Sequence, residues 1–398
     1  MAKLHAGLIW PGSAQGKYTV KAKGFFLAVL SWGTVDGPLP GWGPFGYVPV
    51  DPAGNGSFFL SGMRGIPVGA THVWARCVSH DFIAFEEVSE AIPERYLPAA
   101  SDAPSQSFSI LTDMHLSAKP WRIRQALRAA EGDAILLLGD STNDGFSKQF
   151  EDLDACIRDV APNSIILPVI GNHDIVHPKF SDEGSQNYAG FQEKRLAYAE
   201  TRGLVFERDP DSLAWATRMG ALDVIGLQCV TDGRRFLFPE EKQLDWLEHR
   251  LSAQSDADWH VILCHAPLLH HNPSRSDGQP YLDKDKRLQR LIDETGRIVF
   301  LSGHTHISPN IMKGSAEWDM EAHNLYLNCG SLVDTATEGE TGLMSAEWKD
   351  GCITGLSFAG DVIEITMYSA LSGICFPRGY YRFSDMFTQD HQKAIFKK

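Results

Sequence analysis

From residue 108 onward the chain repeats one order of elements: an apolar run, a polar loop and a helical pattern. Six apolar runs predict strands, at residues 108–112, 134–139, 164–171, 223–230, 260–265 and 297–303. Amphipathic patterns bounded by Pro at the start or Gly after the end predict helices, at residues 121–132, 239–251 and 286–296. Such alternation predicts an α/β domain whose strands are buried and mostly parallel.

The rest of the chain has a different character. Residues 1–92 are rich in Gly and Pro and contain short apolar or alternating runs without a helical period, which predicts a small all-β, sandwich-like N-terminal domain. The Pro, Ala and Ser content of residues 93–107 is typical of a linker. Residues 108–398 form the second predicted domain, with a C-terminal extension from about residue 340. Three roles stay open for this extension: completing a sheet, shaping a pocket or forming a subunit contact.

Composition limits the classes of function. Lys plus Arg total 36 and Asp plus Glu total 50, which gives a formal net charge of −14, so we expect no non-specific binding to nucleic acid. The seven cysteines include no CxxC pair, which argues against a disulfide framework and fits a reducing cytoplasm. The apolar run at residues 24–32 is too short and begins too late for a signal peptide or membrane span. We therefore expect a cytoplasmic protein that does not bind membranes.

Polar residues gather where the predicted strands end. The stretch SIILPVIGNHD (residues 164–174) is apolar until Gly171 and then presents Asn172, His173 and Asp174. Gly, Asn and Asp also suit an ordinary turn, so this stretch alone decides nothing. Four other predicted strands end in residues of the same types, which are Asp113 and His115, Asp140 and Asn143, His265, and His304 and His306. Open α/β sheets bind their ligands at this edge.

These residue types suit metal ions. Asp, His and Asn supply oxygen and nitrogen donors without a thiolate, which favours Zn²⁺, Mn²⁺ or Fe²⁺. Residues i and i+2 of an extended strand point to the same side, so Asp113 and His115 are predicted to reach one point. The same reasoning applies to His304 and His306. Each cluster alone has an ordinary explanation, but five of them in one domain predict a site for two ions about 3.5–4 Å apart.

Five motifs in this order resemble the motif set of the calcineurin-like metallophosphoesterase superfamily: DMH (113–115), GDSTN (139–143), GNHD (171–174), the single His265 and GHTH (303–306). The resemblance covers residues 108–335 and makes residues 108–398 the catalytic domain. It implies an αββα sandwich of two packed sheets flanked by helices, in place of the doubly wound sheet that alternation alone suggests. In motif detail the chain is most similar to class III cyclic-nucleotide phosphodiesterases.

The resemblance also implies a role for each residue of the set. The first metal would be held by Asp113, His115 and His306, the second by Asn172, His265 and His304, and Asp140 would bridge both. His173 resembles the family's histidine that donates to a phosphoryl oxygen or protonates the leaving group. We expect Asp174 to orient its loop through hydrogen bonds rather than to bind metal.

Asn143 departs from the pattern of many relatives. They carry a second Asp three residues after the bridging Asp, and it pairs with the catalytic histidine. With Asn at this position, the chain resembles the class III phosphodiesterases. Because Asn carries no charge, we expect the contact that orients His173 to be uncharged. Three histidines on loops beside the predicted site are further candidates for substrate contact, with simple solvation as the alternative: His177, His270 and His271.

The resulting hypothesis is a dinuclear metal-dependent phosphoesterase that hydrolyses a phosphodiester or cyclic-nucleotide-like substrate by attack of a metal-bridging hydroxide. One alternative is a phosphomonoesterase acting on a sugar phosphate or nucleotide. Another is a non-catalytic binding module with this fold, which the complete set of seven candidate ligands disfavours. The expected cofactors are two divalent transition-metal ions (Mn, Zn or Fe). The expected partner is a small phosphoester substrate, and a homo-oligomer is left open.

Overall fold

The structure is a computed structural model of the chain, and for the strands before residue 106 it describes the backbone alone. The described residues are 4–9, 17–22, 27–34, 37–38, 46–49, 55–59, 72–77, 82–88, 106–116, 120–175, 181–232, 235–236, 241–268, 271, 286–306, 315–319, 321–333, 351–360, 362–370 and 375–383.

The N-terminal part contributes eight strands in two sheets. The strands are β1 (Leu4–Ile9), β2 (Lys17–Ala22), β3 (Leu27–Thr34), β4 (Gly37–Pro38), β5 (Gly46–Pro49), β6 (Asn55–Phe59), β7 (His72–Cys77) and β8 (Phe82–Val88). One sheet has the order β1-β7-β3-β4 with β5 beside β3, and the other has the order β6-β2-β8. The packing of side chains between these sheets lies outside the described residues, so the sandwich-like domain stays a prediction. The linker predicted before β9 lies there too.

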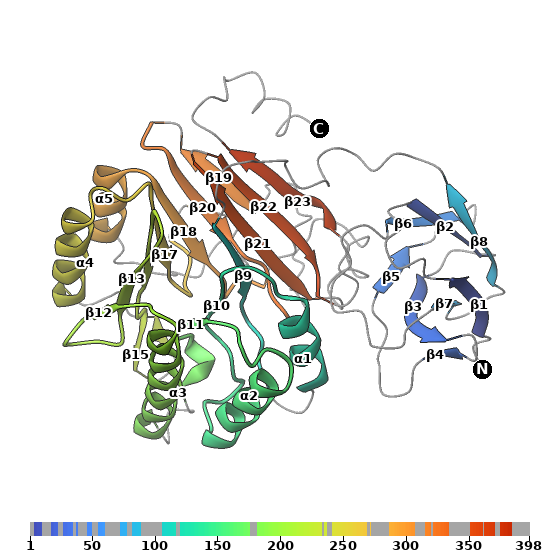
Figure 1. Cartoon of the computed structure of the whole chain (residues 1–398), viewed down its shortest axis with the longest axis horizontal. Helices are drawn as coiled ribbons and strands as arrows, with labels where there is room; N and C mark the ends of the chain where they lie inside the picture. Colours follow the sequence, from blue (N-terminus) through green and yellow to red (C-terminus); the bar gives the residue numbers. More distant parts are fainter. Residues whose placement is uncertain are drawn as a thin grey trace.

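Two mixed sheets form the remainder of the fold (Figure 1). The first, in spatial order, consists of β11 (Ile166–Val169), β10 (Ala134–Leu138), β9 (Gln106–Leu111), β21 (Cys352–Ala359), β22 (Val362–Ser369) and β23 (Cys375–Phe383). The second consists of β12 (Phe206–Arg208), β13 (Trp215–Met219), β14 (Leu222–Gly226), β17 (Trp259–Leu263), β18 (Ile298–Ser302), β20 (Asn324–Asn328) and β19 (Ala316–Asp319). A separate short hairpin pairs β15 (Val230–Asp232) with β16 (Arg235–Phe236).

The two sheets pack face to face and helices cover their outer faces. Alternate strand residues of both sheets form one apolar cluster between them, which includes Ile110, Leu136, Val169, Val224, Val261, Leu301, Leu356 and Ile365. The other strand faces pack against apolar helix residues such as Ile123, Leu153, Leu247 and Ile292. The helices are α1 (Pro120–Ala129), α2 (Ser147–Val160), α3 (Ser181–Thr201), α4 (Glu241–Ala253) and α5 (Lys286–Thr295). This is the two-sheet α/β arrangement that the resemblance implies.

The six strands predicted from residue 108 onward are all present, and they correspond to β9, β10, β11, β14, β17 and β18. Wherever two of them pair with each other, the pairing is parallel. The prediction of mostly parallel strands is nevertheless wrong for the sheets as a whole, because β12, β13, β19, β21, β22 and β23 pair antiparallel with their neighbours. Helices α1, α4 and α5 match the predicted ones, whereas α2 and α3 were not predicted.

The C-terminal strands belong to the first sheet. Strand β21 pairs antiparallel with β9, and Leu356 lies opposite Phe108 in that register. Strand β22 follows β21 as a hairpin, and β23 adds the outer edge. The extension therefore completes a sheet whose central strand leads directly into Asp113. Among the described helices none is both long enough and apolar enough to cross a membrane.

Candidate metal centre

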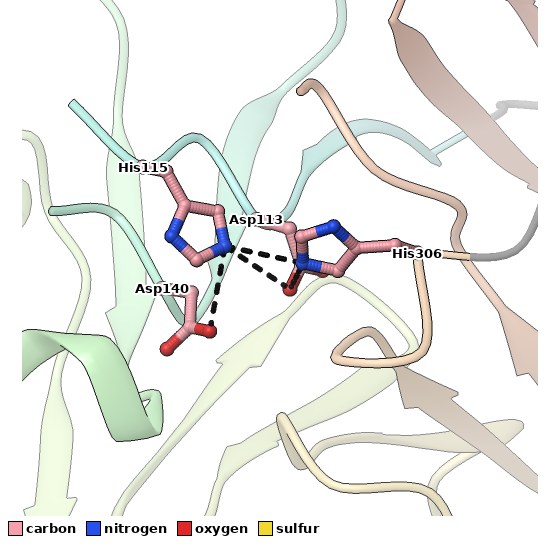
Figure 2. A group of neighbouring side chains, drawn as sticks. All are labelled: Asp113, His115, Asp140 and His306. Atoms are coloured by element: carbon pink, nitrogen blue, oxygen red, sulfur yellow. Dashed lines mark hydrogen bonds and ion pairs between the residues drawn. The ribbon is translucent and has the colours of Figure 1, made fainter. Parts of the chain in front are cut away.

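Four side chains from three strand-end loops converge on one point, as Figure 2 shows. They are Asp113 and His115 after β9, Asp140 after β10, and His306 after β18. One nitrogen or oxygen atom of each lies within 4.8 Å of the corresponding atoms of the others. Nε2 of His306 is 3.0 Å from Oδ1 of Asp113 and 3.1 Å from Nε2 of His115. Two imidazole nitrogens that face each other this closely, beside a carboxylate, form a set of donors directed at a common centre.

A second group shares one member with the first. Asp140, His265 and His304 offer atoms that again lie within 4.8 Å of one another. Nε2 of His265 lies 3.2 Å from Oδ2 of Asp140. On its other side, Nδ1 of His265 donates to the carbonyl oxygen of Leu138 at 2.7 Å, which directs Nε2 toward the carboxylates. Asp140 thus belongs to both groups, as a bridging carboxylate must.

The backbone reaches this arrangement through the left-handed region of φ. Five candidate ligands have positive φ angles, which are Asp113 (52°), His115 (42°), Asp140 (49°), His304 (63°) and His306 (53°). The expectation that the pairs two residues apart meet because the strand is extended is therefore wrong. Strands β9 and β18 end before these residues, and the side chains meet because each loop turns back sharply. Non-glycine residues hold this conformation at a cost of about 1–3 kcal/mol each, so their surroundings must enforce it.

Glycine at three strand ends permits the close approach of the loops. A Cβ atom on Gly171 would lie 2.1 Å from the backbone nitrogen of Asp140, and one on Gly139 would lie 2.5 Å from Nδ1 of His265. A Cβ atom on Gly303 would lie 2.0 Å from Oγ1 of Thr112. Real Cβ atoms do not approach other atoms so closely. The glycine of each motif is thus needed because a neighbouring loop occupies the space of its side chain.

Hydrogen bonds between the loops fix Asp113, and one residue that takes part in them, Thr112, was not among the predicted site residues. Oδ2 of Asp113 accepts from the backbone N–H of His304 at 2.9 Å and lies 2.7 Å from the hydroxyl of Thr112. The backbone N–H of Asp113 donates to the carbonyl of Gly139, and that of His115 donates to the carbonyl of Asp140. Thr112 could have been suspected only from its place directly before the DMH motif.

The GNHD segment forms a 3-10 turn, η2 (Asn172–Asp174), that is bound to the loop after β10. The backbone N–H of His173 donates to Oδ1 of Asp140 at 2.6 Å. Asp174 is fully buried and accepts from the backbone N–H groups of Gly171 and Thr142, both at 2.9 Å. The expectation that Asp174 orients its loop through hydrogen bonds is confirmed.

His173 and Asn143 meet as expected, but through a different atom. Nδ1 of His173 donates to the backbone carbonyl of Asn143 at 2.9 Å. The contact is uncharged, as predicted, although it does not use the side-chain amide. Nδ2 of that amide donates instead to Oδ2 of Asp144 at 2.9 Å. His173 also packs edge-on against His115, with the ring centroids 4.5 Å apart, so it lies next to the first group.

The electrostatics of the cluster prepare most of these residues to bind a cation. Burial opposes charge on Asp140, but the charge of His265 outweighs it and lowers the pKa of Asp140 to about 2. The pKa of Asp113 is lowered further, against burial, by His306 and His265. Burial lowers the pKa of His115 to about 4 and that of His304 to about 3, so both rings are neutral at pH 7.

His265 behaves differently from the other two imidazoles. Burial would lower its pKa, but the carboxylates of Asp140 and Asp113 outweigh that effect and raise it to about 10. Two fully buried carboxylates share this one positive charge at close range. A divalent cation in place of the proton would compensate them better, because it carries more charge to the same point.

The donor set fits transition-metal ions. Oδ1 of Asn172 is buried and accepts no hydrogen bond from the described residues, a costly state for an amide oxygen without another partner. Asn172 lies between Gly171, which abuts Asp140, and His173, which donates to it. The backbone on both sides of Asn172 thus lies against the shared carboxylate residue. Buried Asp and His groups of this kind are consistent with a site for two metal ions, of the type that imidazole and carboxylate ligands select.

Of the three lesser candidates, the structure describes His271, whose contacts lie outside the two groups of candidate ligands. His271 stacks on Tyr326 with the ring centroids 3.8 Å apart, and its Nδ1 lies 2.9 Å from Oε1 of Glu317. These contacts engage both its face and its edge. His177 and His270 lie outside the described residues. Substrate contact by these three histidines stays a prediction.

Comparison with known proteins gave one family match and several structural likenesses. A sequence profile of the calcineurin-like phosphoesterase family matches residues 107–308, which is half of the chain. A dimetal phosphatase from Danio rerio is 13% identical, with 70% of this chain and 98% of that chain covered and a TM-score of 0.49. The PhoD structure is 10% identical, with coverage of 99% and 96% and a TM-score of 0.45. GAP50, the anchor in the inner membrane complex of Plasmodium, is 13% identical, with coverage of 70% and 88% and a TM-score of 0.42. No curated protein matched.

Proposed function

Because this chain belongs to the calcineurin-like phosphoesterase family, we propose that it hydrolyses a phosphodiester or cyclic-nucleotide substrate with the help of two divalent transition-metal ions. The observation that carries the proposal is the position of Asp140, which is shared by two groups of buried Asp and His donors. A single ion would need only one of these groups. The first ion would be held by Asp113, His115 and His306, the second by Asn172, His265 and His304, and Asp140 would serve both.

Bound ions of the Mn, Zn or Fe type supply Lewis acidity toward phosphoryl oxygens and lower the pKa of water near neutral pH. The chain supplies the geometry. Left-handed backbone at five ligand positions and hydrogen bonds between the loops hold the donors in place before substrate arrives. A site preorganised in this way does not have to reorganise as negative charge develops on the equatorial oxygens of phosphorus.

His173 is the residue that we assign to proton transfer. Its Nδ1 carries a proton, because the carbonyl oxygen of Asn143 can only accept. Nε2 is then the atom that can hold a second proton and donate it to the leaving oxygen. Its ring lies beside His115 and its backbone is bound to Asp140, so a phosphoryl group at the metal pair would be within its reach.

The preference for a diester rests on Asn143. This residue stands three positions after Asp140, where the class III phosphodiesterases that the chain resembles have Asn. A small phosphoester substrate and a cytoplasmic location belong to the same proposal. A phosphomonoesterase would use the same donors and differ in the shape of its substrate pocket.

The test combines metal analysis with a substrate pair. The as-purified protein is analysed for Mn, Zn and Fe, and hydrolysis of bis(p-nitrophenyl) phosphate is compared with that of p-nitrophenyl phosphate. We expect about two ions per chain and a larger kcat/KM for the diester. Asp140→Ala, purified in parallel, is the matched variant and should lose both ions and all turnover.

Two outcomes would count against the proposal in different ways. A larger kcat/KM for the monoester would overturn the diester preference and leave the metal chemistry in place. Full activity in Asp140→Ala, or in protein treated with a chelator, would contradict the metal-dependent reaction itself.

A further inference from the structure

Beside the metal cluster, a chain of hydrogen bonds connects helix α2 to the loop that carries Asn143. Oδ2 of Asp144 accepts from Nδ2 of Asn143 at 2.9 Å and from Nε2 of Gln149 at 3.1 Å. Gln149 lies in the first turn of α2. Its Oε1 accepts in turn from the backbone N–H of Asp144 at 3.0 Å and from that of Phe146 at 3.4 Å. No step of the proposed reaction uses Asp144 or Gln149.

The direction of every bond in this chain is determined by the backbone. A backbone N–H can only donate, so the two N–H groups require an oxygen at the near end of the Gln149 amide. The amide nitrogen of Gln149 must then face Asp144, whose ionised carboxylate only accepts. That carboxylate in turn requires a donor from Asn143, which places Nδ2 toward Asp144 and Oδ1 away from it.

The orientation of the Asn143 amide matters because the two ends of an amide are almost equal in shape and opposite in hydrogen bonding. Without a fixed partner, the side chain could present either end to a substrate. Bonds to an ionised acceptor are stronger than bonds between neutral groups, so Asp144 selects one orientation. The same residue, Asn143, also accepts from Nδ1 of His173 through its backbone carbonyl. Its position therefore affects both candidate catalytic side chains.

We propose that Asp144 is a positioning residue, which fixes the orientation of the Asn143 amide toward the phosphoester, and that Gln149 holds Asp144 in place from helix α2. The inference rests on the proposed function, in which His173 transfers the proton and Asn143 holds it through a backbone carbonyl. It extends that function to a residue outside the predicted site. Asp144 is a carboxylate one position after Asn143, and it accepts a hydrogen bond from the Asn143 amide.

A purely structural role is the competing explanation. Gln149 and Asp144 could do no more than satisfy the backbone N–H groups at the start of α2, as capping residues do. In that case their loss would lower stability and leave the kinetics of the folded enzyme unchanged. Stability and turnover therefore separate the two explanations.

The experiment uses the metal-loaded full-length protein and bis(p-nitrophenyl) phosphate. We expect Asp144→Ala to lower kcat by about tenfold, one step of 1.4 kcal/mol in the barrier, while two ions stay bound and KM changes less than twofold. Asp144→Asn keeps an oxygen that both neighbouring amides can use, so it should restore kcat to within about threefold of wild type. Asp152→Asn is the control, because Asp152 on α2 pairs only with Lys148 among the contacts described and should not alter turnover.

A double variant decides whether Asp144 acts through Asn143. In the Asn143→Ala background, Asp144→Ala should cause no further loss of kcat, because the amide that it orients is already gone. Gln149→Ala provides a second, milder disruption and should lower kcat in the same direction without loss of metal.

Three results would overturn the positioning role: an unchanged kcat in Asp144→Ala, an equal loss in the presence and absence of Asn143, or a loss that follows metal content. If the wild-type protein hydrolyses no phosphoester, the proposed function fails and the positioning role fails with it. An active wild type with an equally active Asp144→Ala variant contradicts the positioning role alone.

Discussion

The imidazole rings of two histidines are oriented by the same kind of hydrogen bond. In His265 and in His173, Nδ1 donates to a backbone carbonyl, from Leu138 and Asn143 respectively. A carbonyl oxygen only accepts, so Nδ1 keeps its proton and Nε2 is left for chemistry. Nε2 of His265 then faces the Asp140 carboxylate, the position that a ligand of the proposed second metal would take. Among the described residues, the group that accepts from Nδ1 of His173 is a neutral carbonyl, which suits the proton-donor role that we propose for it.

Replacing His173 tests this assignment. We expect His173→Ala to keep two bound ions and to lower kcat by about 10²–10⁴, the usual range for a general acid. The loss should grow as the leaving group becomes more basic, because poor leaving groups depend most on protonation. A kcat series over phosphodiesters with aryl and alkyl leaving groups measures it. Equal losses for all leaving groups would contradict the role of His173 as a proton donor.

Metal binding should be coupled to release of a proton from His265. The pKa of this ring is raised to about 10 before metal binds, so the ring is protonated at pH 7, whereas a metal needs its neutral form. Apparent metal affinity should therefore rise with pH, by about tenfold per unit between pH 6 and 8. Titration calorimetry of Mn²⁺ in buffers of different ionisation enthalpy measures the proton count. An affinity independent of pH and no proton release would contradict this coupling.

The strand-end loops, rather than the strands, create the metal centre. The loops after β9, β10 and β18 exchange backbone hydrogen bonds with neighbouring segments and turn through left-handed residues where ligands stand. Gly139, Gly171 and Gly303 leave space for the adjoining loop in each case. Glycine is therefore part of the metal-binding geometry although it contributes no donor atom.

Replacing a crowded glycine, Gly171, and an uncrowded one, Gly190, by Ala tests whether the loops need this close approach. Gly171→Ala should reduce both metal content and turnover, because the new Cβ would lie 2.1 Å and 2.3 Å from two atoms of Asp140. Gly190→Ala in helix α3 meets nothing within 4 Å and should raise stability by about 0.5–1 kcal/mol without altering activity. Metal analysis and thermal unfolding of both variants measure these effects. Full metal loading in Gly171→Ala would show that the loops do not need this close approach.

The two sheets depend on segments that are far apart in sequence. Strand β9, which leads into Asp113, is held on one side by β10 and on the other by β21, more than 200 positions later in the chain. The apolar layer between the sheets includes Leu356, Ile363 and Ile365 from β21 and β22. The C-terminal strands are thus part of the body that carries the site, rather than an appendage to it.

Shortening one buried side chain tests this role of the C-terminal strands. Ile365→Ala should lower the free energy of unfolding by about 2–5 kcal/mol, because the side chain is fully buried between the sheets. Metal stoichiometry at low temperature should stay at two, since Ile365 belongs to the apolar cluster between the sheets and not to the two groups of candidate ligands. Val205→Ala, at a position that is 81% exposed, is the control and should change stability by no more than about 0.5 kcal/mol. Urea unfolding measures both, and equal stabilities would place Ile365 outside the core.

Much of the fold could be predicted from the sequence because buried parallel strands are continuous apolar runs. AILLL and WHVIL, for example, are buried at every position, as β10 and β17. The antiparallel strands were harder to predict, since β21 alternates buried and half-buried residues and pairs with a strand far away in sequence. Helix α2 has neither Pro at its start nor Gly directly after its end, which are the boundary signals that marked the predicted helices, although Phe150, Leu153 and Ile157 lie on one buried face.

The residues of the site were predictable from their types, whereas the way in which they meet was not. Asp113 and His115 were expected to share a side through strand geometry, yet both have positive φ angles. Asn143 was expected near His173, but the contact uses a backbone carbonyl that no sequence pattern reports. The hydrogen bonds of Thr112 and Asp144 depend on the folded loops, and beyond their places next to two motifs the sequence does not distinguish them.

The most direct measurement is a crystal structure of the protein grown with Mn²⁺, with anomalous scattering used to locate the ions. We expect two peaks about 3.5–4 Å apart, both bonded to the carboxylate of Asp140. Asp113, His115 and His306 should complete the shell of one ion, and Asn172, His265 and His304 that of the other. A lack of any ion among these side chains, or a single ion that Asp140 does not touch, would contradict the account.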